Sequence, residues 1–134
     1  MQLRAELSQC VEAAAEKKAE DILVLDLRKR SDFTDFFVIC HGGSDRQVLA
    51  IADAVEERLA AKFDLEPNHV EGRRHGEWVL LDYIDFVVHV FTAEKRSFFA
   101  LERLWGDAPR IVDLSESVSP PPRKKRPPRP SASG

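Results

Sequence analysis

Several features that would assign a protein to a familiar class are missing from this 134-residue sequence. No apolar run approaches the roughly 18 residues that a membrane-spanning helix needs. The first residues lack the basic start and apolar stretch of a secretory signal. Only two cysteines occur, Cys10 and Cys40, and each lies inside an apolar pattern rather than in a paired metal-type spacing. We therefore expect a cytoplasmic protein with two buried, reduced thiols, no disulfide framework and no membrane contact.

Signatures of metal sites and nucleotide cofactors are missing as well. The four histidines, at positions 41, 69, 75 and 89, share no metal-ligand spacing, and no His-Glu-x-x-His motif occurs. There is no Walker loop, and the adjacent glycines at positions 42 and 43 do not make a dinucleotide fingerprint. These absences predict a protein that uses neither a metal nor a cofactor.

Charge is distributed unevenly along the chain, whose formal net charge is −3. Residues 115–134 hold five basic side chains and one acid, a net charge of +4, so residues 1–114 carry 15 basic and 22 acidic side chains, a net charge of −7. A body this acidic is repelled by bare phosphate backbone and attracted by a basic surface. The charge of the body therefore favours a basic protein over nucleic acid as its partner.

The last 20 residues differ in composition from the rest. They hold six of the eight prolines and almost no apolar side chains, which predicts a disordered or polyproline-like tail and a folded domain at residues 1–114. The basic cluster at residues 123–126 suits a weak, salt-sensitive contact with RNA phosphates, and suits equally a tail that only aids solubility.

Apolar periodicity divides residues 1–114 into helices and strands. Helical spacing predicts helices at about residues 3–14, 44–63 and 94–105, the last ending before Gly106 and Pro109. Short apolar runs predict strands at about residues 22–27, 36–40, 69–72, 78–82 and 86–91. The order α-β-β-α-β-β-β-α predicts an α/β fold in which helices flank a mixed five-stranded sheet.

The segment after the second predicted strand has the most enzyme-like sequence. Gly43 and Ser44 open a helix, as in the phosphate loop of nucleotidyltransferases, where helix amides hold an anion. That chemistry needs two metal-binding carboxylates on one strand face, whereas Asp82 and Asp85 are three residues apart across a turn. Ser44 and Gln47 instead match a capping box, which explains the serine without a ligand. The capping interpretation is favoured, and nucleotidyl transfer through the Gly43-Ser44 loop is the alternative function.

The predicted strand at residues 78–82 has the composition of an interface. Because side chains alternate along a strand, Trp78 and Asp82 share one face, opposite to Tyr83. An aromatic anchor beside an acid suits docking on a basic partner, but the pattern is equally compatible with Trp78 as an ordinary core residue. In the next strand His89 alternates with apolar neighbours, which favours a hydrogen-bonded core histidine over a ligand.

Several motifs in fixed order resemble the ribosomal silencing factor family, which is related to the plant protein Iojap. The match covers about residues 3–107, and its motifs are residues 21–26, 34–39 and 43–47, Glu71-Gly72 followed by Trp78, residues 81–83 and 88–91, and finally Arg96, Phe99 and residues 101–105. A match of this extent, with its motifs in the same order, is highly specific.

The resemblance implies a nucleotidyltransferase-like fold without transferase activity. It also implies that the protein binds large-subunit ribosomal protein fourteen, sterically blocks joining of the small and large ribosomal subunits, and represses translation when nutrients are short, as in stationary phase. The residues that carry over as partner-binding candidates are Glu71, Gly72, Trp78, Asp82, Tyr83, His89 and Arg96. The oligomeric state, including a homodimer, is left open, as is a third reading in which the tail makes the protein an RNA-binding module.

Two features depart from the family pattern. Ile84 stands where family members usually have glycine, and because a β-branched residue avoids positive φ, we expect the turn there to take another shape. The proline- and arginine-rich tail has no counterpart that we can identify in the family.

Overall fold

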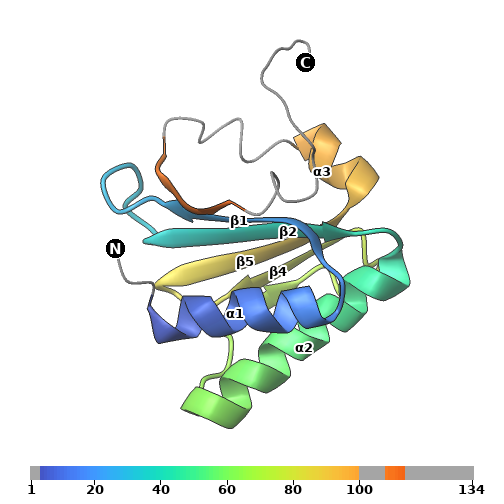
Figure 1. Ribbon diagram of the computed structural model, residues 1–134, viewed down its shortest axis with the longest axis horizontal. Helices are drawn as coiled ribbons and strands as arrows, with labels where there is room; N and C mark the ends of the chain where they lie inside the picture. Colours follow the sequence, from blue (N-terminus) through green and yellow to red (C-terminus); the bar gives the residue numbers. More distant parts are fainter. Residues whose placement is uncertain (1–3, 100–107, 114–134) are drawn as a thin grey trace.

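The computed structural model describes residues 4–99 and 108–113, which form a single mixed sheet with helices on both faces (Figure 1). In chain order the elements are α1 (Ala5–Glu16), β1 (Glu20–Asp26), β2 (Phe36–Gly42), α2 (Asp45–Phe63), β3 (His69–Glu71), β4 (Trp78–Asp82), β5 (Phe86–Thr92), α3 (Ala93–Phe99) and β6 (Arg110–Asp113). The strand order is β3-β4-β5-β2-β1-β6. β2 and β5 pair in parallel at the centre, and the other described pairs are antiparallel. The predicted mixed α/β architecture is confirmed.

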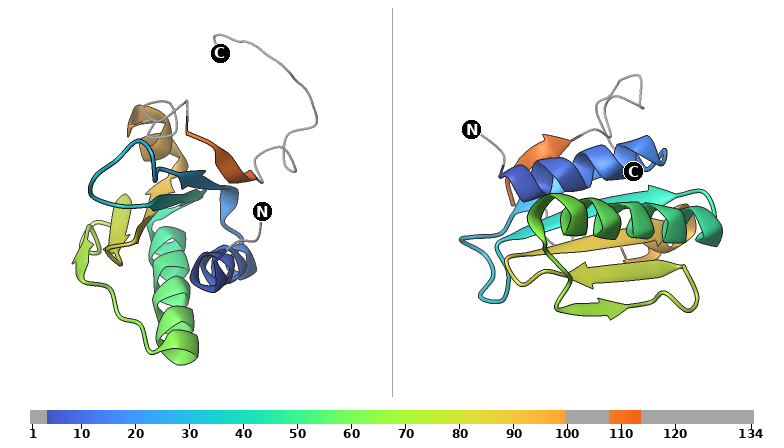
Figure 2. Two further views of the ribbon diagram at one scale, coloured as in Figure 1. Left: turned by 90° about the vertical axis from the view of Figure 1, so that its left-hand side faces the viewer. Right: turned by 90° about the horizontal axis from the view of Figure 1, so that it is seen from below.

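Helices α1 and α2 lie side by side across one face of the sheet, and α3 lies on the opposite side (Figures 1 and 2). Strand alternation explains how both faces become apolar. The strand residues that face α1 and α2 include Val24, Val38 and Val88, all at most 1% exposed. The opposite face has its own smaller apolar cluster: Leu23, Leu25, Leu27, Phe37, Ile39, Val87, Phe91 and Ala108.

The sheet has six strands rather than the predicted five. The additional strand, β6, pairs with β1 at one edge, with Val112 opposite Val24. Sequence analysis missed it because only four residues form it and Pro109, which was read as the stop signal beyond the preceding helix, directly precedes it; residues 110–113 were assigned to no element. Its position is fixed by a hydrogen bond of 2.9 Å from the Asp26 amide to the Pro109 carbonyl.

Three other predictions concern the ends of the chain and its thiols. α3 begins close to the predicted position, but the rest of the predicted helix, like the tail at residues 115–134, lies outside the described residues. Both cysteines are free and buried, as predicted, and burial raises the pKa of the Cys40 thiol to about 12. In the described part of the chain, no helix has the length and apolarity needed to span a membrane.

Candidate functional site: the sheet face opposite α1 and α2

The loop that leads into α2 is closed by the chain's own hydrogen bonds. The Gln47 amide donates to the Ser44 Oγ at 3.1 Å, and the Gln47 Oε1 accepts from the Gly43 amide at 2.7 Å. The Gln47 Nε2 also donates to the carbonyls of Lys17 and Lys18 at 3.2 and 3.1 Å, which ties the loop to the end of α1. The predicted capping role of Ser44 is therefore confirmed. In the usual capping box the glutamine side chain accepts from the amide of the capping residue itself, whereas here Gln47 accepts from the amide of Gly43, one residue earlier.

Carboxylates do not gather beside this loop. Asp82 Oδ1 accepts from the Ile84 amide at 2.8 Å, and Asp85 lies 3.8 Å from the Arg4 guanidinium. Within residues 4–99 and 108–113, no group of three or more histidine, cysteine, aspartate or glutamate side chains could hold a metal ion. The segment that has the sequence of a phosphate loop thus works as a helix cap in this structure.

The face of the sheet opposite α1 and α2 carries an aromatic cluster, defined here as Trp78, His89, Phe91 and Phe37. The indole Nε1 of Trp78 donates to His89 Nδ1 at 3.1 Å. The Trp78 ring stacks on Phe91 with 5.0 Å between centroids, and the Phe37 ring meets the His89 ring edge-on at 4.5 Å. These contacts hold Trp78, which is half-buried, in one orientation on the sheet.

His89 is the buried centre of the aromatic cluster. Its side chain is 4% exposed, and burial lowers its pKa from 6.5 to about 3, so the ring is neutral at physiological pH. Because Nδ1 accepts from Trp78, the proton of the neutral ring is assigned to Nε2. That N–H is buried and has no hydrogen-bond partner among the described residues. The prediction of a hydrogen-bonded core histidine is confirmed.

Gly72 allows the chain to cross over the backbone of Trp78. It has φ +90°, and a Cβ added there would lie 1.8 Å from the Trp78 carbonyl oxygen. The turn that follows is closed by a 3.0 Å hydrogen bond from the Gly76 amide to the Gly72 carbonyl. Only glycine fits this position, because it lacks the Cβ that would collide and tolerates the positive φ. Gly72 therefore positions the start of β4.

The turn between β4 and β5 is strained at Ile84. Ile84 has φ +75°, and the Asp85 amide donates to the Tyr83 carbonyl at 2.9 Å, which makes a γ-turn of the rare, positive-φ kind. The expectation that a β-branched residue would give this turn another shape is wrong. The turn is held by Thr34 Oγ1, which donates to the Ile84 carbonyl at 3.0 Å, and by the Asp82 carboxylate described above. These bonds outweigh the local preference of isoleucine.

Tyr83 and Arg96 lie away from the aromatic cluster. Tyr83 is 6% exposed, packs in the core beneath α1 and α2, and stacks on Phe86 with 4.9 Å between ring centroids. Burial raises the pKa of its hydroxyl above the ordinary value. Arg96, 7% exposed, donates to the Asp21 carbonyl at 2.6 Å and to His41 Nδ1 at 3.0 Å. Arg96 thus joins α3 to β1 and β2.

Of the seven predicted site residues, four belong to one group, namely Trp78, His89 and Asp82 with Gly72 as their support. The other three, Glu71, Tyr83 and Arg96, lie at separate positions. Trp78, His89 and Asp82 lie on β4 and β5 and point to the same sheet face. Gly72 supports them, and Glu71 lies exposed on the edge strand β3, where its carboxylate pairs with His69 Nε2 at 2.6 Å. Sequence analysis missed Phe37 as a member of the group. Its alternation with Ile39 was visible, but its contact with His89 depends on the pairing of β2 with β5.

Comparison with known proteins gives consistent matches along the chain. The family model described as "Ribosomal silencing factor during starvation" matches residues 1–133. Ribosomal silencing factor RsfS of Bacillus subtilis is 47% identical over 102 residues, covering 76% of this chain and 85% of the relative. The same-named protein of Halalkalibacterium halodurans is 43% identical over 113 residues, covering 84% and 95%.

More distant matches include a plant protein and a solved structure. The chloroplastic protein Iojap of Zea mays is 36% identical over 105 residues, covering 74% of this chain and 42% of the plant protein. A crystal structure of a protein from Chromobacterium violaceum superposes with a TM-score of 0.74 at 31% identity, covering 89% of this chain and all of that one. The α/β architecture is thus shared with an experimentally determined structure.

Proposed function

This chain belongs to the ribosomal silencing factor family, and on that premise we propose that it silences ribosomes by occlusion: it binds the large subunit through ribosomal protein fourteen and keeps the small subunit from joining. We propose that it does so when nutrients are short. The action is binding and steric exclusion, without catalysis.

The observation that carries the proposal is the oriented tryptophan on the sheet face opposite α1 and α2. Trp78 is half-buried in the free protein, and its indole N–H and ring are already fixed by His89 and Phe91. Aromatic side chains held in one orientation lose little conformational entropy on binding and are the commonest interface anchors. Leu80 and Asp82 on the same strand face are also half-buried, so partly accessible surface continues along β4.

Charge supports a basic partner. Residues 1–114 carry a net charge of −7, and Asp82 places a carboxylate on the same face as Trp78. A basic ribosomal protein would be drawn to such a surface at long range, which speeds association. Fast capture of free large subunits suits a factor that competes with the small subunit for them.

The sheet face is tested with one substitution that removes a ring and one that removes a charge. Trp78→Ala should weaken binding to large subunits by about 2 kcal/mol or more, as expected for an interface anchor. Asp82→Asn keeps the oxygen that accepts from the Ile84 amide but removes the negative charge, so it should lower the association rate. Asp64→Asn is the matched control, because Asp64 is exposed at the end of α2 in a left-handed conformation that asparagine tolerates.

The measurement is sedimentation of purified large and small subunits with each variant at near-physiological salt. Wild-type protein and Asp64→Asn should co-migrate with the large subunit and reduce joined ribosomes. Full activity of a folded Trp78→Ala protein would remove this face from the interface. Normal subunit joining with wild-type protein would overturn the proposal of occlusion itself.

A further inference from the structure

Two large apolar side chains are exposed among the described residues: Phe33, which is 64% exposed, and Ile84, which is 59% exposed. Phe33 lies on the β1–β2 loop, residues 27–35, and Ile84 lies on the turn between β4 and β5. A single exposed apolar side chain is common on protein surfaces and needs no explanation. These two differ because the segments that carry them are bonded to each other, and together they are called the apolar rim below.

The two segments hold the apolar rim in place. Thr34 Oγ1 donates to the Ile84 carbonyl at 3.0 Å, and the Asp35 amide donates to the Asp85 carbonyl at 2.9 Å. The base of the β1–β2 loop is closed by a 2.7 Å hydrogen bond from the Leu27 amide to the Asp35 carbonyl. The backbone of the rim is therefore ordered before any partner binds, which lowers the entropy lost on binding.

The apolar rim borders the sheet face that carries the aromatic cluster. The Phe33 ring lies 6.3 Å from the ring of Phe37, a member of that cluster. On the other side, the Ile84 amide donates to Asp82 Oδ1 at 2.8 Å, and Asp82 points to the same face. The β1–β2 loop curls away from the side of the sheet that α1 and α2 cover (Figures 1 and 2). Since β2 is two strands from β4, about 10 Å at the usual spacing, one partner can span both.

The fold itself gains little from the two exposed side chains. Ile84 has φ +75°, a strained conformation for a β-branched residue, and most of its side chain stays in water. Strained positions that the surrounding structure holds in place are typical of functional sites. Phe33 likewise leaves most of its ring unburied, so both side chains keep apolar surface that a complex can remove from water.

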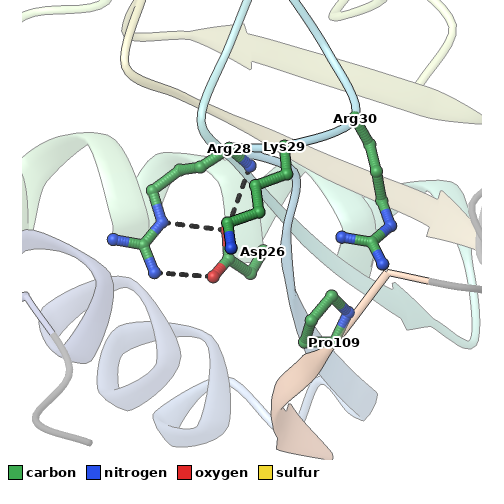
Figure 3. A pocket seen from close by; sticks show the side chains of 5 residues that line it. All are labelled: Asp26, Arg28, Lys29, Arg30 and Pro109. Atoms are coloured by element: carbon green, nitrogen blue, oxygen red, sulfur yellow. Dashed lines mark hydrogen bonds and ion pairs between the residues drawn. The ribbon is translucent and has the colours of Figure 1, made fainter.

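The charge around the apolar rim favours a protein over RNA. Residues 26–35 hold equal numbers of basic and acidic side chains, namely Arg28, Lys29, Arg30, Asp26, Asp32 and Asp35. In the pocket at the base of the loop, Arg28 is turned toward Asp26, with its Nη2 2.7 Å from Oδ2 (Figure 3). The β4–β5 turn and its flank add only acids, Asp82 and Asp85. The exposed ring therefore lacks the positively charged groove that accompanies base stacking on single-stranded RNA.

We propose that the apolar rim is a second anchor for the basic large-subunit protein docked on β4, an inference that rests on the proposed function. The partner buries the Phe33 ring and the Ile84 side chain while its other contacts lie on Trp78 and Asp82. It must present an apolar patch beside its basic residues. A second copy of this chain suits the rim less well, because two bodies that each carry a net charge of −7 repel one another.

Three variants of the full chain test the rim by titration of large subunits and sedimentation. Phe33→Ala should weaken binding about tenfold, as expected when a buried aromatic anchor is lost. Ile84→Ala removes a smaller apolar side chain but keeps the Cβ at the positive φ, so it should weaken binding about threefold. Phe33→Leu is the matched control, because it keeps a large apolar side chain and should lose less affinity than Phe33→Ala. Urea unfolding checks that all three keep nearly wild-type stability, as expected for exposed positions.

Further probes identify what touches the rim. Isolated ribosomal protein fourteen should show the same order of losses as whole subunits, whereas protein-free large-subunit RNA should bind Phe33→Ala and the wild type equally. A photoreactive benzoylphenylalanine in place of Phe33 keeps a ring and should cross-link to ribosomal protein fourteen in whole subunits. Sedimentation equilibrium of the free protein should give the same mass for Phe33→Ala and the wild type.

The outcomes separate this inference from the proposed function. If Trp78→Ala binds weakly while a folded Phe33→Ala protein binds like the wild type, the inference falls and the proposed function stands. If the wild type does not bind large subunits, both fall. A loss confined to protein-free RNA would assign Phe33 to base stacking, and a wild-type dimer that Phe33→Ala dissociates would assign it to a second copy; either result overturns the inference, as does a cross-link to a different component.

Discussion

Lowering the pH should destabilise the protein through His89. In the folded state burial lowers the pKa of His89 from 6.5 to about 3, whereas the unfolded chain titrates near 6.5. Between these values the unfolded state binds a proton that the folded state excludes. Stability is therefore complete above about pH 6.5 and is lost as the pH falls through this window. At pH 5, about 1.5 units below the pKa of the unfolded chain, the protein should have lost about 2 kcal/mol of its free energy of unfolding relative to neutral pH.

The assay compares pH dependence rather than absolute stability. Urea unfolding is followed by circular dichroism at pH 7, 6 and 5 for the wild type and for His89→Gln, whose amide oxygen can accept from Trp78 but cannot titrate. All other titrating groups are common to both proteins, so the difference between their pH dependences isolates His89. We expect the wild type to lose about 2 kcal/mol more than His89→Gln between pH 7 and pH 5. Parallel pH dependences would refute the reasoning and place His89 in a solvated environment.

Two backbone predictions follow from the positive φ angles. Ile84 has φ +75° and is 59% exposed. In urea unfolding the Ile84→Gly variant should be more stable than the Ile84→Ala variant by about 1 kcal/mol, because the Cβ penalty at positive φ exceeds the extra chain entropy of glycine. The opposite order would mean that the turn is relaxed. Gly72→Ala should lower the free energy of unfolding by more than about 2 kcal/mol, since the added Cβ would lie 1.8 Å from the Trp78 carbonyl oxygen. The same substitution should weaken subunit binding. A Gly72→Ala protein as stable as the wild type would contradict the described crossing of the chain over Trp78.

Much of the fold could be predicted because its signals are local. The runs at residues 22–27, 36–40 and 86–91 are apolar except for Asp26 and His89, and all three appear as strands at or near the centre of the sheet. The cap at Ser44 was readable for the same reason, since its partner Gln47 is three residues away. β6 was missed because its four residues become a strand only through pairing with β1.

The candidate site was less predictable, because it depends on pairing between distant segments. Trp78 and Asp82 could be assigned to one face by alternation, but the same alternation could not tell which face the helices cover. Tyr83, on the opposite face of the strand, turned out to lie under the helices, so it is a core residue and not a member of the site. Ile84 shows the same limit at a single residue: its conformation is set by Thr34, 50 positions away, and not by its own preference.

The parallel pairing of β2 with β5 has a consequence for how the protein is made. Phe36 pairs with Phe86, so the two central strands meet only after the chain between them, which holds α2 and the β3–β4 hairpin, has been synthesised. α1, β1 and β2 can assemble earlier, because β1 and β2 are neighbours in sequence. Contacts between distant segments form slowly, and His89 joins Trp78 only when β5 takes its place. A nascent chain that still lacks β5 therefore has not formed the face proposed for docking, and we expect affinity for large subunits to appear only after β5 has been made and has paired with β2.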